Sequence, residues 1–268
     1  MSRPKVTIAA VATTSALPRL GRTARRDRWW LSPLVVASAL TAFGLYSLVV
    51  AIQGSHYLYE EGGAHYLSPF FSPDLESLLG VEIPFSPALL VLWAPLGLRL
   101  TCYYYRKAYY RSFFLAPPAC AVTGLPRKYG GESRFPLILQ NVHRYFLYFA
   151  TIVLGFLWYD AIRAFFFRTS GGSLELGMGV GSLVLLVNVA ALTAFTFGCN
   201  SARHLVGGKL DCFTCTRAAR TRFRLWRGVT VLNLRHAEWA WISLVTVFLA
   251  DLYIRLAAYG VFDDPRIF

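Results

Sequence analysis

The fold class is decided by residues 31–53, which read LSPLVVASALTAFGLYSLVVAIQ. This run contains no charged side chain. A helix needs about 20 apolar residues to cross a hydrocarbon core about 30 Å thick, because backbone N–H and C=O groups find no water to bond to there. The run therefore predicts a transmembrane helix.

Four further apolar runs have the length of a membrane-spanning helix. They cover residues 87–105, 136–167, 176–199 and 234–259. The whole chain of 268 residues is 56% hydrophobic and 15% charged, whereas a soluble domain is about 25% charged. We therefore predict an all-α integral membrane bundle of about five transmembrane helices, which occupies residues 31–260.

The orientation follows from Lys and Arg, which are retained on the cytoplasmic side of a membrane. Residues 1–30 contain seven, residues 106–134 contain six and residues 201–235 contain eight, which together make 21 of the 27. The connection 53–85 contains none and is acidic instead. We therefore expect a cytoplasmic N-terminus with residues 1–30 as a flexible basic tail, and residues 261–268 as a short external tail.

The formal net charge of +13 has the same explanation. In a soluble protein such a charge would suggest nucleic acid, but here the basic residues separate apolar runs and form no single patch. We expect membrane lipids as partners, and no nucleic acid. No dinucleotide or P-loop glycine motif is present, so nothing predicts that this chain binds FAD.

All five cysteines fall at or beyond the predicted cytoplasmic ends of the helices. They are Cys102, Cys120, Cys199, Cys212 and Cys215. Structural disulfides are uncommon in that reducing compartment. One explanation of these positions is ordinary packing, because Cys often behaves as a small buried hydrophobe.

A second explanation is a metal centre, because three predicted helices bring sulfur or imidazole to a similar depth. Cys102 closes the second helix, His143 lies about two turns into the third, and His236 opens the fifth. Cys120 follows two prolines in a loop that could fold back against them. Two thiolates and two imidazoles suit zinc, or an iron–sulfur cluster with two Cys on one iron and two His on the other.

Two other metal assignments are also open. Cys199, His204, Cys212 and Cys215 resemble the ligand set of a zinc ribbon, because a CxxC turn lets two thiolates chelate one ion. Only one CxxC is present. Haem b held by two histidines on facing helices, such as His143 and His236, is the third possibility.

Five segments of the chain follow the pattern of one known family. They are residues 100–111 (LTCYYYRKAYYR), 116–120 (APPAC), 134–146 (RFPLILQNVHRYF), 203–208 (RHLVGG) and 232–236 (LNLRH). In this order they resemble the membrane anchor subunit of actinobacterial-type succinate dehydrogenases. The resemblance implies a multi-pass subunit of the bacterial cytoplasmic membrane, the non-flavin part of complex II in the respiratory chain and the tricarboxylic acid cycle. Such a subunit anchors a flavoprotein and an iron–sulfur protein and passes the electrons of succinate to quinone.

The same resemblance implies a Rieske-type [2Fe–2S] cluster in place of haem. Carried over residue by residue, it assigns Cys102 and Cys120 to one iron and His143 and His236 to the other, with His204 as an alternative histidine. Neutral imidazole ligands make such a cluster less negative than an all-Cys cluster and raise its reduction potential. The rival interpretations are a haem b anchor of the same complex and a membrane scaffold with a structural zinc site.

A quinone site needs aromatic walls and one or two hydrogen-bond donors near the inner interface. Trp30, Tyr104, Arg203 and His204 offer these groups. Trp and Tyr also line membrane interfaces without binding any ligand, and basic loops also contact anionic lipid headgroups.

Overall fold

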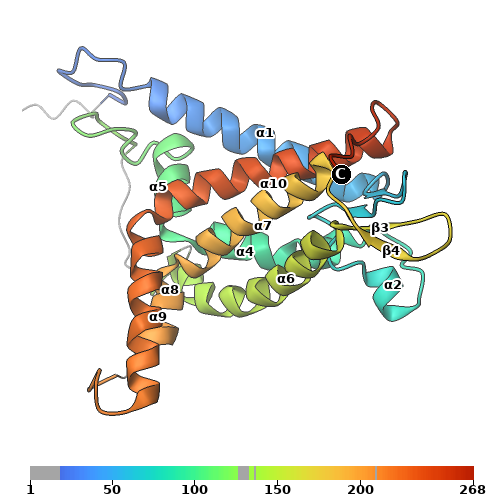
Figure 1. Ribbon diagram of the computed structural model, residues 1–268. Coiled ribbons are helices and arrows are strands. Elements are labelled where there is room, and N and C mark those ends of the chain that lie inside the picture. The colour runs from blue at the N-terminus through green and yellow to red at the C-terminus, as the bar shows by residue number, and fades with distance from the viewer. Residues whose placement is uncertain (1–18, 126–132, 136, 209) are drawn as a thin grey trace, which may run out of the picture. The chain divides into compact units, whose positions relative to one another are not determined.

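A computed structural model describes residues 19–125, 133–135, 137–208 and 210–268 (Figure 1). The chain divides into two compact units. The first comprises Met1–Ala37 and Ala108–Tyr129, and the second comprises Ser38–Lys107 and Gly130–Phe268.

In the first unit, the basic segment 19–30 is hydrogen-bonded to the loop 120–123, which lies far from it in the sequence. The N–H of Gly21 donates to the carbonyl oxygen of Thr123 at 2.8 Å. Arg25 donates from Nη1 to the carbonyl oxygen of Cys120 at 2.9 Å. Residues 19–30, predicted as part of a flexible tail, therefore have a defined backbone, because this loop supplies their hydrogen-bond partners.

Among the described residues, four helices are long and apolar enough to cross a membrane. They are α1 (Leu31–Gln53), α6 (His143–Arg163) with the 3-10 turn η1 (Leu137–Val142) before it, α7 (Val180–Phe197) and α10 (His236–Ala258). Their apolar residues lie on all sides, as in helices that contact lipid or one another throughout. The predicted helical membrane architecture is confirmed.

The second predicted span, residues 87–105, differs from the prediction. It is divided into α3 (Ala88–Val91), α4 (Trp93–Thr101) and α5 (Tyr103–Ser112). Pro95 has no N–H to donate to the carbonyl of Val91, so the helical hydrogen bonding is interrupted there. Cys102, between α4 and α5, has an extended backbone with φ −68° and ψ 135°. The prediction of one continuous helix was wrong, because hydropathy does not register such breaks.

Two short hairpins close the end of the second unit opposite to Cys102. β1 (Leu58–Tyr59) pairs with β2 (Tyr66–Leu67), so that Tyr59 lies opposite Tyr66. β3 (Phe166–Arg168) pairs with β4 (Leu174–Leu176) in the connection from α6 to α7. The predicted spans 136–167 and 176–199 therefore extended too far at this end, because β3 and β4 are apolar enough to be read as helix.

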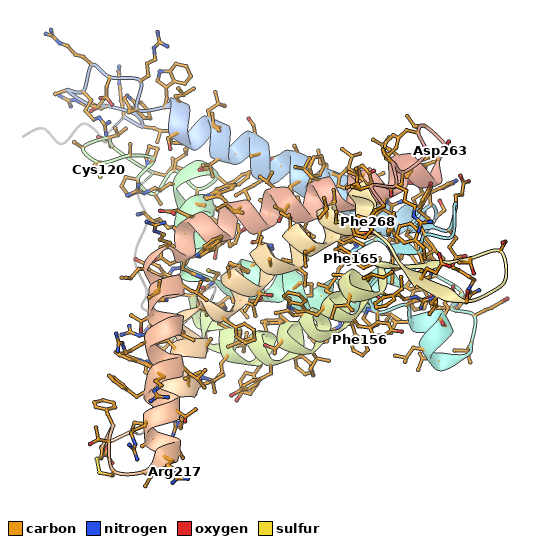
Figure 2. The ribbon with its side chains drawn as sticks, viewed as in Figure 1. Cys120, Phe156, Phe165, Arg217, Asp263 and Phe268 are labelled. Atoms are coloured by element: carbon orange, nitrogen blue, oxygen red, sulfur yellow. A yellow bond between two sulfur atoms is a disulfide. The ribbon has the colours of Figure 1, made fainter. Side chains whose placement is uncertain are left out.

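Three further helices lie in the connections. They are α2 (Leu75–Leu79), α8 (Asn200–Gly207) and α9 (Arg217–Leu234). α9 leads into the start of α10 and extends away from it in another direction (Figure 1), and its first residue, Arg217, is labelled in Figure 2. The backbone turns between α9 and α10 at Arg235, which has φ −111° and ψ 23°.

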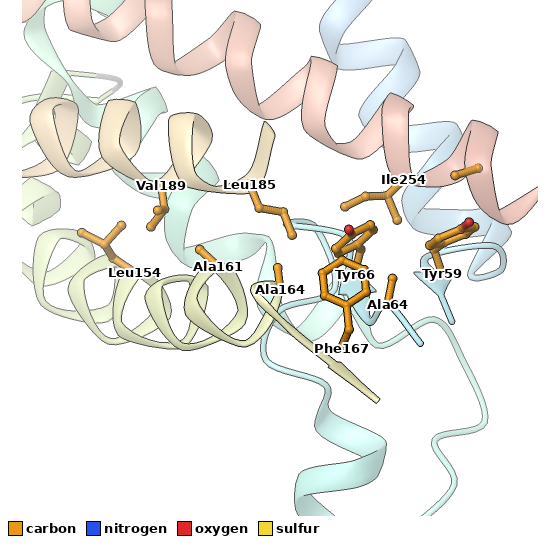
Figure 3. Packing of buried hydrophobic residues seen from close by; sticks show 11 residues of the cluster. Tyr59, Ala64, Tyr66, Leu154, Ala161, Ala164, Phe167, Leu185, Val189 and Ile254 are labelled. Atoms are coloured by element: carbon orange, nitrogen blue, oxygen red, sulfur yellow. The ribbon is translucent and has the colours of Figure 1, made fainter. Parts of the chain in front are cut away.

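The packing of the second unit relies on small residues between long helices (Figure 3). Ala161 of α6 is 1% exposed and lies in one buried cluster with Leu185 and Val189 of α7 and Ile254 of α10. Tyr66, which is fully buried, joins the β1–β2 hairpin to the same cluster. The hairpin end of the bundle is therefore a packed core.

A buried ion pair lies near this core. Asp251, which is 0% exposed, accepts hydrogen bonds from Arg255 Nε at 2.9 Å and from Tyr46 at 2.5 Å. Ser68 donates a third hydrogen bond to the same carboxylate. The Nη1 of Arg255 donates to the carbonyl oxygen of Ser55 at 2.6 Å. Each charge in this pair is therefore compensated inside the protein.

The last residues of the chain pack against the bundle. The N–H of Ile267 donates to the carbonyl oxygen of Met178 at 2.7 Å. The carboxylate of Asp264 accepts from Tyr66 at 2.8 Å and from the N–H of Gly181 at 2.8 Å. Phe268 accordingly lies beside the start of α7 (Figure 2). Residues 261–268, predicted as an external tail, are thus fixed by hydrogen bonds.

Candidate metal centre

At the other end of the second unit, two cysteines and two histidines form two close pairs. The Sγ of Cys199 lies 2.9 Å from Nε2 of His143. The Sγ of Cys102 lies 3.6 Å from Nε2 of His236. Cys102, Cys199 and His236 are 2%, 4% and 3% exposed. Both cysteines belong to one buried cluster, so the two pairs share one apolar environment.

All four side chains occur where a helix begins. His143 and His236 are the first residues of α6 and α10. Cys102 immediately precedes α5, and Cys199 is the N-cap of α8 with φ −65° and ψ 142°. Helix N-termini carry free N–H groups and a partial positive charge, which favour an anionic partner.

These N–H groups reach the sulfur atoms. The N–H of Ser201 donates to Sγ of Cys199 at 3.4 Å. The backbone N–H groups of Tyr104 and Tyr105 interact in the same way with Cys102. Burial raises the pKa of both thiols, and these donors oppose that effect by stabilising the thiolate, which is the form of cysteine that binds metals.

The tautomer of His143 follows from its neighbour Thr101. The hydroxyl of Thr101 donates its hydrogen to the carbonyl oxygen of Gly97 at 2.7 Å. Its oxygen also lies 2.8 Å from Nδ1 of His143, so Nδ1 must be the donor in that contact. The lone pair is then on Nε2, which faces Cys199. Metal-binding histidines are commonly fixed by such a hydrogen bond from the other ring nitrogen.

The Nδ1 of His236 is buried and has no hydrogen-bond partner among the described residues. The ring stacks on Phe195, with centroids 5.1 Å apart and an angle of 3° between the planes. Gly198 lies against the same nitrogen, since a Cβ added there would be 3.1 Å from Nδ1. An unpaired buried nitrogen is costly, and a metal ligand bond is one way to satisfy it.

The cluster contains three of the four ligands predicted from the sequence. Cys120 belongs to the first unit, where its side chain is exposed, and it is not among the residues that the second unit brings together. Cys199 is present instead. It had been considered only for a zinc ribbon, although its position after the fourth span, at the same predicted depth as Cys102, is a signal that could have found it.

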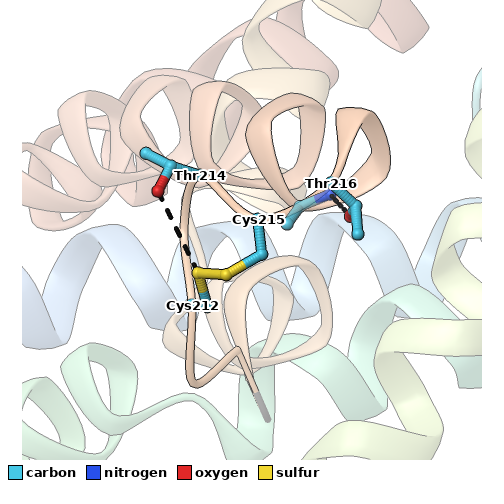
Figure 4. Close-up of a disulfide and its surroundings, with 5 residues drawn as sticks. Cys212, Thr214, Cys215 and Thr216 are labelled. Atoms are coloured by element: carbon cyan, nitrogen blue, oxygen red, sulfur yellow. Dashed lines mark hydrogen bonds between the residues drawn. A yellow bond between two sulfur atoms is a disulfide. The ribbon is translucent and has the colours of Figure 1, made fainter.

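The cysteines of the zinc-ribbon alternative do not lie together around one point. Cys212 and Cys215 form a disulfide in the exposed loop before α9 (Figure 4), while Cys199 is buried beside His143. His204 is exposed on α8. In the described part of the chain, no three His, Cys, Asp or Glu side chains already surround one point as ion ligands. The arrangement is therefore two thiol and imidazole pairs, each of which can supply two ligands.

The predicted quinone contacts divide into three groups. The ring of Tyr104 lies 5.4 Å from that of His236. Arg203 follows Cys199 by one helical turn, and its guanidinium lies 4.7 Å from the ring centroid of Trp226, a residue that sequence reasoning missed. The Nε of Arg203 is buried without a partner among the described residues. Trp30 lies in the first unit and is exposed.

Comparisons with known proteins agree with this architecture. The family model described as actinobacterial succinate dehydrogenase subunit SdhC matches residues 31–260. A chain of the solved structure "Mycobacterium smegmatis Sdh1 complex in the apo form" is 43% identical, with a TM-score of 0.80, over 92% of this chain and 94% of that chain. None of the curated proteins compared with the sequence matches it. The chain belongs to the family of the membrane subunit SdhC of actinobacterial succinate dehydrogenase, a multi-pass protein of the bacterial cytoplasmic membrane.

Proposed function

We propose that this chain anchors a complete succinate:quinone oxidoreductase to the membrane and relays electrons from its soluble iron–sulfur subunit to quinone through a Rieske-type [2Fe–2S] cluster. The partners are a flavoprotein and an iron–sulfur protein, since the related chain is part of a structure described as an Sdh1 complex. The observation that carries the proposal is the pair of buried thiol and imidazole contacts at one end of α6 and α10.

The proposed ligands are Cys102, Cys199, His143 and His236. Two cysteines and two histidines suit zinc as well as an iron–sulfur cluster, but zinc has no redox chemistry and cannot serve electron transfer to quinone. A [2Fe–2S] group with two histidine ligands supplies one-electron transfer at a higher potential than an all-cysteine cluster. The Nε2 atoms of both histidines face the thiols, which supports this ligand set.

The cluster is favoured over haem b by where the imidazoles point. In both pairs, Nε2 of the histidine is turned to a sulfur atom. Haem held by His143 and His236 would need no thiols beside these nitrogens, whereas a cluster with mixed ligands needs both types.

Quinone is proposed to bind beside this site, between Tyr104 and α8. The unpaired Nε of Arg203 is a donor for a quinone carbonyl, and the ring of Trp226 is an apolar wall next to it. His204 is the second donor on the same helix, and it is exposed as a headgroup contact would be.

The test is low-temperature electron paramagnetic resonance (EPR) of the reduced, purified complex, together with iron and acid-labile sulfide analysis. The Cys199→Ser and Cys120→Ser variants are compared side by side. We expect a Rieske-type signal that is lost in Cys199→Ser and retained in Cys120→Ser. Loss in Cys120→Ser alone would assign that cysteine as the ligand, and a pyridine haemochrome signal in place of the cluster signal would refute the proposed cofactor.

A further inference from the structure

The second unit contains a second buried cation, Arg99. It lies on α4, two residues before Thr101, and is 9% exposed. Its Nη1 donates to the hydroxyl of Tyr105 at 2.5 Å, and its Nη2 donates to Oγ of Ser243 at 3.1 Å. In the described ranges of the chain, no Asp or Glu forms an ion pair with it.

Another buried arginine, at the opposite end of the bundle, does have a carboxylate partner. Arg255 is 4% exposed and is paired with the fully buried carboxylate of Asp251. An isolated charge in a membrane bundle is costly, and arginines there are usually paired or directed to functional sites. In the part of the chain that the structure describes, Arg99 has only neutral hydrogen-bond partners, which leave its charge uncompensated.

The ring of Phe195 contacts both Arg99 and one of the thiol and imidazole pairs. The guanidinium of Arg99 lies 4.6 Å from the ring centroid of Phe195, and the same ring stacks on His236 at 5.1 Å. Arg99 is also only three residues before Cys102 in the chain, and both residues are buried. The Tyr105 hydroxyl that Arg99 contacts donates its own hydrogen to the carbonyl oxygen of Ala240 and stays neutral. The cysteines of the site, in contrast, become anionic when they bind a metal.

We propose that Arg99 is the counter-charge of the thiolates at the metal centre and raises the reduction potential of that centre. The inference rests on the proposed function. A positive charge in an apolar site stabilises the state with one more electron, and the low dielectric around Phe195 preserves that interaction. Arg99 is thus a positioning and tuning residue that contacts neither quinone nor ligand atoms directly.

The experiment measures the midpoint potential of the cluster by EPR-monitored redox titration of the intact complex. Arg99→Gln removes the charge, and Arg99→Lys retains it. Ser243→Asp neutralises the charge while leaving Arg99 in place, because a carboxylate then stands where Oγ accepts from Nη2. Matched controls are Ser243→Ala, which changes no charge, and Arg163→Gln, which removes an arginine at the far end of α6.

We expect Arg99→Gln and Ser243→Asp to lower the reduced-to-oxidised ratio at a fixed potential about tenfold, which is about 59 mV for a one-electron couple. Arg99→Lys, Ser243→Ala and Arg163→Gln should titrate as wild type. An unchanged potential in Ser243→Asp would overturn the inference, even if Arg99→Gln failed to assemble. A wild-type complex without a cluster signal would instead refute the proposed function, so the two failures are distinguishable.

Discussion

The hydroxyl of Thr101 is expected to control how firmly the proposed centre holds its iron. In Thr101→Val the side chain keeps its shape and loses the oxygen that accepts from Nδ1 of His143 at 2.8 Å. Thr101 is only 8% exposed, so water has little access to replace the lost acceptor. The half-buried N–H of His143 would then lose this acceptor, and the ring would be free to change tautomer or turn.

The size of the effect follows from the loss of that hydrogen bond. Leaving a buried donor unsatisfied costs about 1–3 kcal/mol, and about 1.4 kcal/mol corresponds to a factor of ten in an equilibrium constant. The expected loss of metal affinity is therefore about 10- to 100-fold, which is also the usual effect of removing the hydrogen-bond partner of a metal-bound histidine.

The assay is the rate at which the purified complex loses iron and its EPR signal in the presence of a chelator. Thr101→Ser is the matched control, because serine keeps the hydroxyl and removes only a methyl group. We expect rapid iron loss in Thr101→Val and wild-type retention in Thr101→Ser. Equal retention in both variants would show that Thr101 does not orient His143.

Three further outcomes are expected. Asp251→Asn should destabilise the subunit by about 3–5 kcal/mol, because it leaves the cation of Arg255 buried without a counter-charge; thermal unfolding in detergent measures this, and an unchanged midpoint would contradict it. Arg203→Gln should raise the KM for quinone about tenfold, the worth of one charged hydrogen bond, with an unchanged cluster signal; an effect on kcat alone would argue against a quinone contact. Cys212→Ser combined with Cys215→Ser should leave quinone reductase turnover at the wild-type level, and a loss of iron in that double variant would reassign the pair as ligands.

Hydropathy predicted the depth of the functional groups and could not predict their neighbours. The positions of Cys102, His143 and His236 near helix ends were sufficient to place them at one side of the membrane. Whether Cys120 or Cys199 completes the set depends on which loop folds towards the bundle, and loop direction is set by tertiary contacts that no single segment encodes. Cys199 is turned inwards because α8 begins directly after it.

The interruptions of the helix within residues 87–105 could not be predicted from hydropathy either. Residues 87–105 have the composition of one span, yet the backbone becomes extended at Cys102. Irregular backbone at membrane depth occurs where it is buried in protein or lines a functional cavity. The departure from a simple hydropathy pattern therefore falls at a residue of the candidate site, as expected where local regularity is given up for function.

The interruptions of helical structure at Cys102 and at Cys199 also determine the electrostatics of the site. α4 and α7 arrive at the cysteines with their C-terminal ends, whose partial negative charge would oppose the formation of thiolates. Because α5 and α8 begin immediately after Cys102 and Cys199, each sulfur also receives the N–H donors of a new helix. α6 and α10 add two more N-terminal ends through their first residues. Continuous helices through the cysteines would have removed two of these four positive ends. The segmented path of the chain would therefore favour the two thiolates that the proposed metal centre needs.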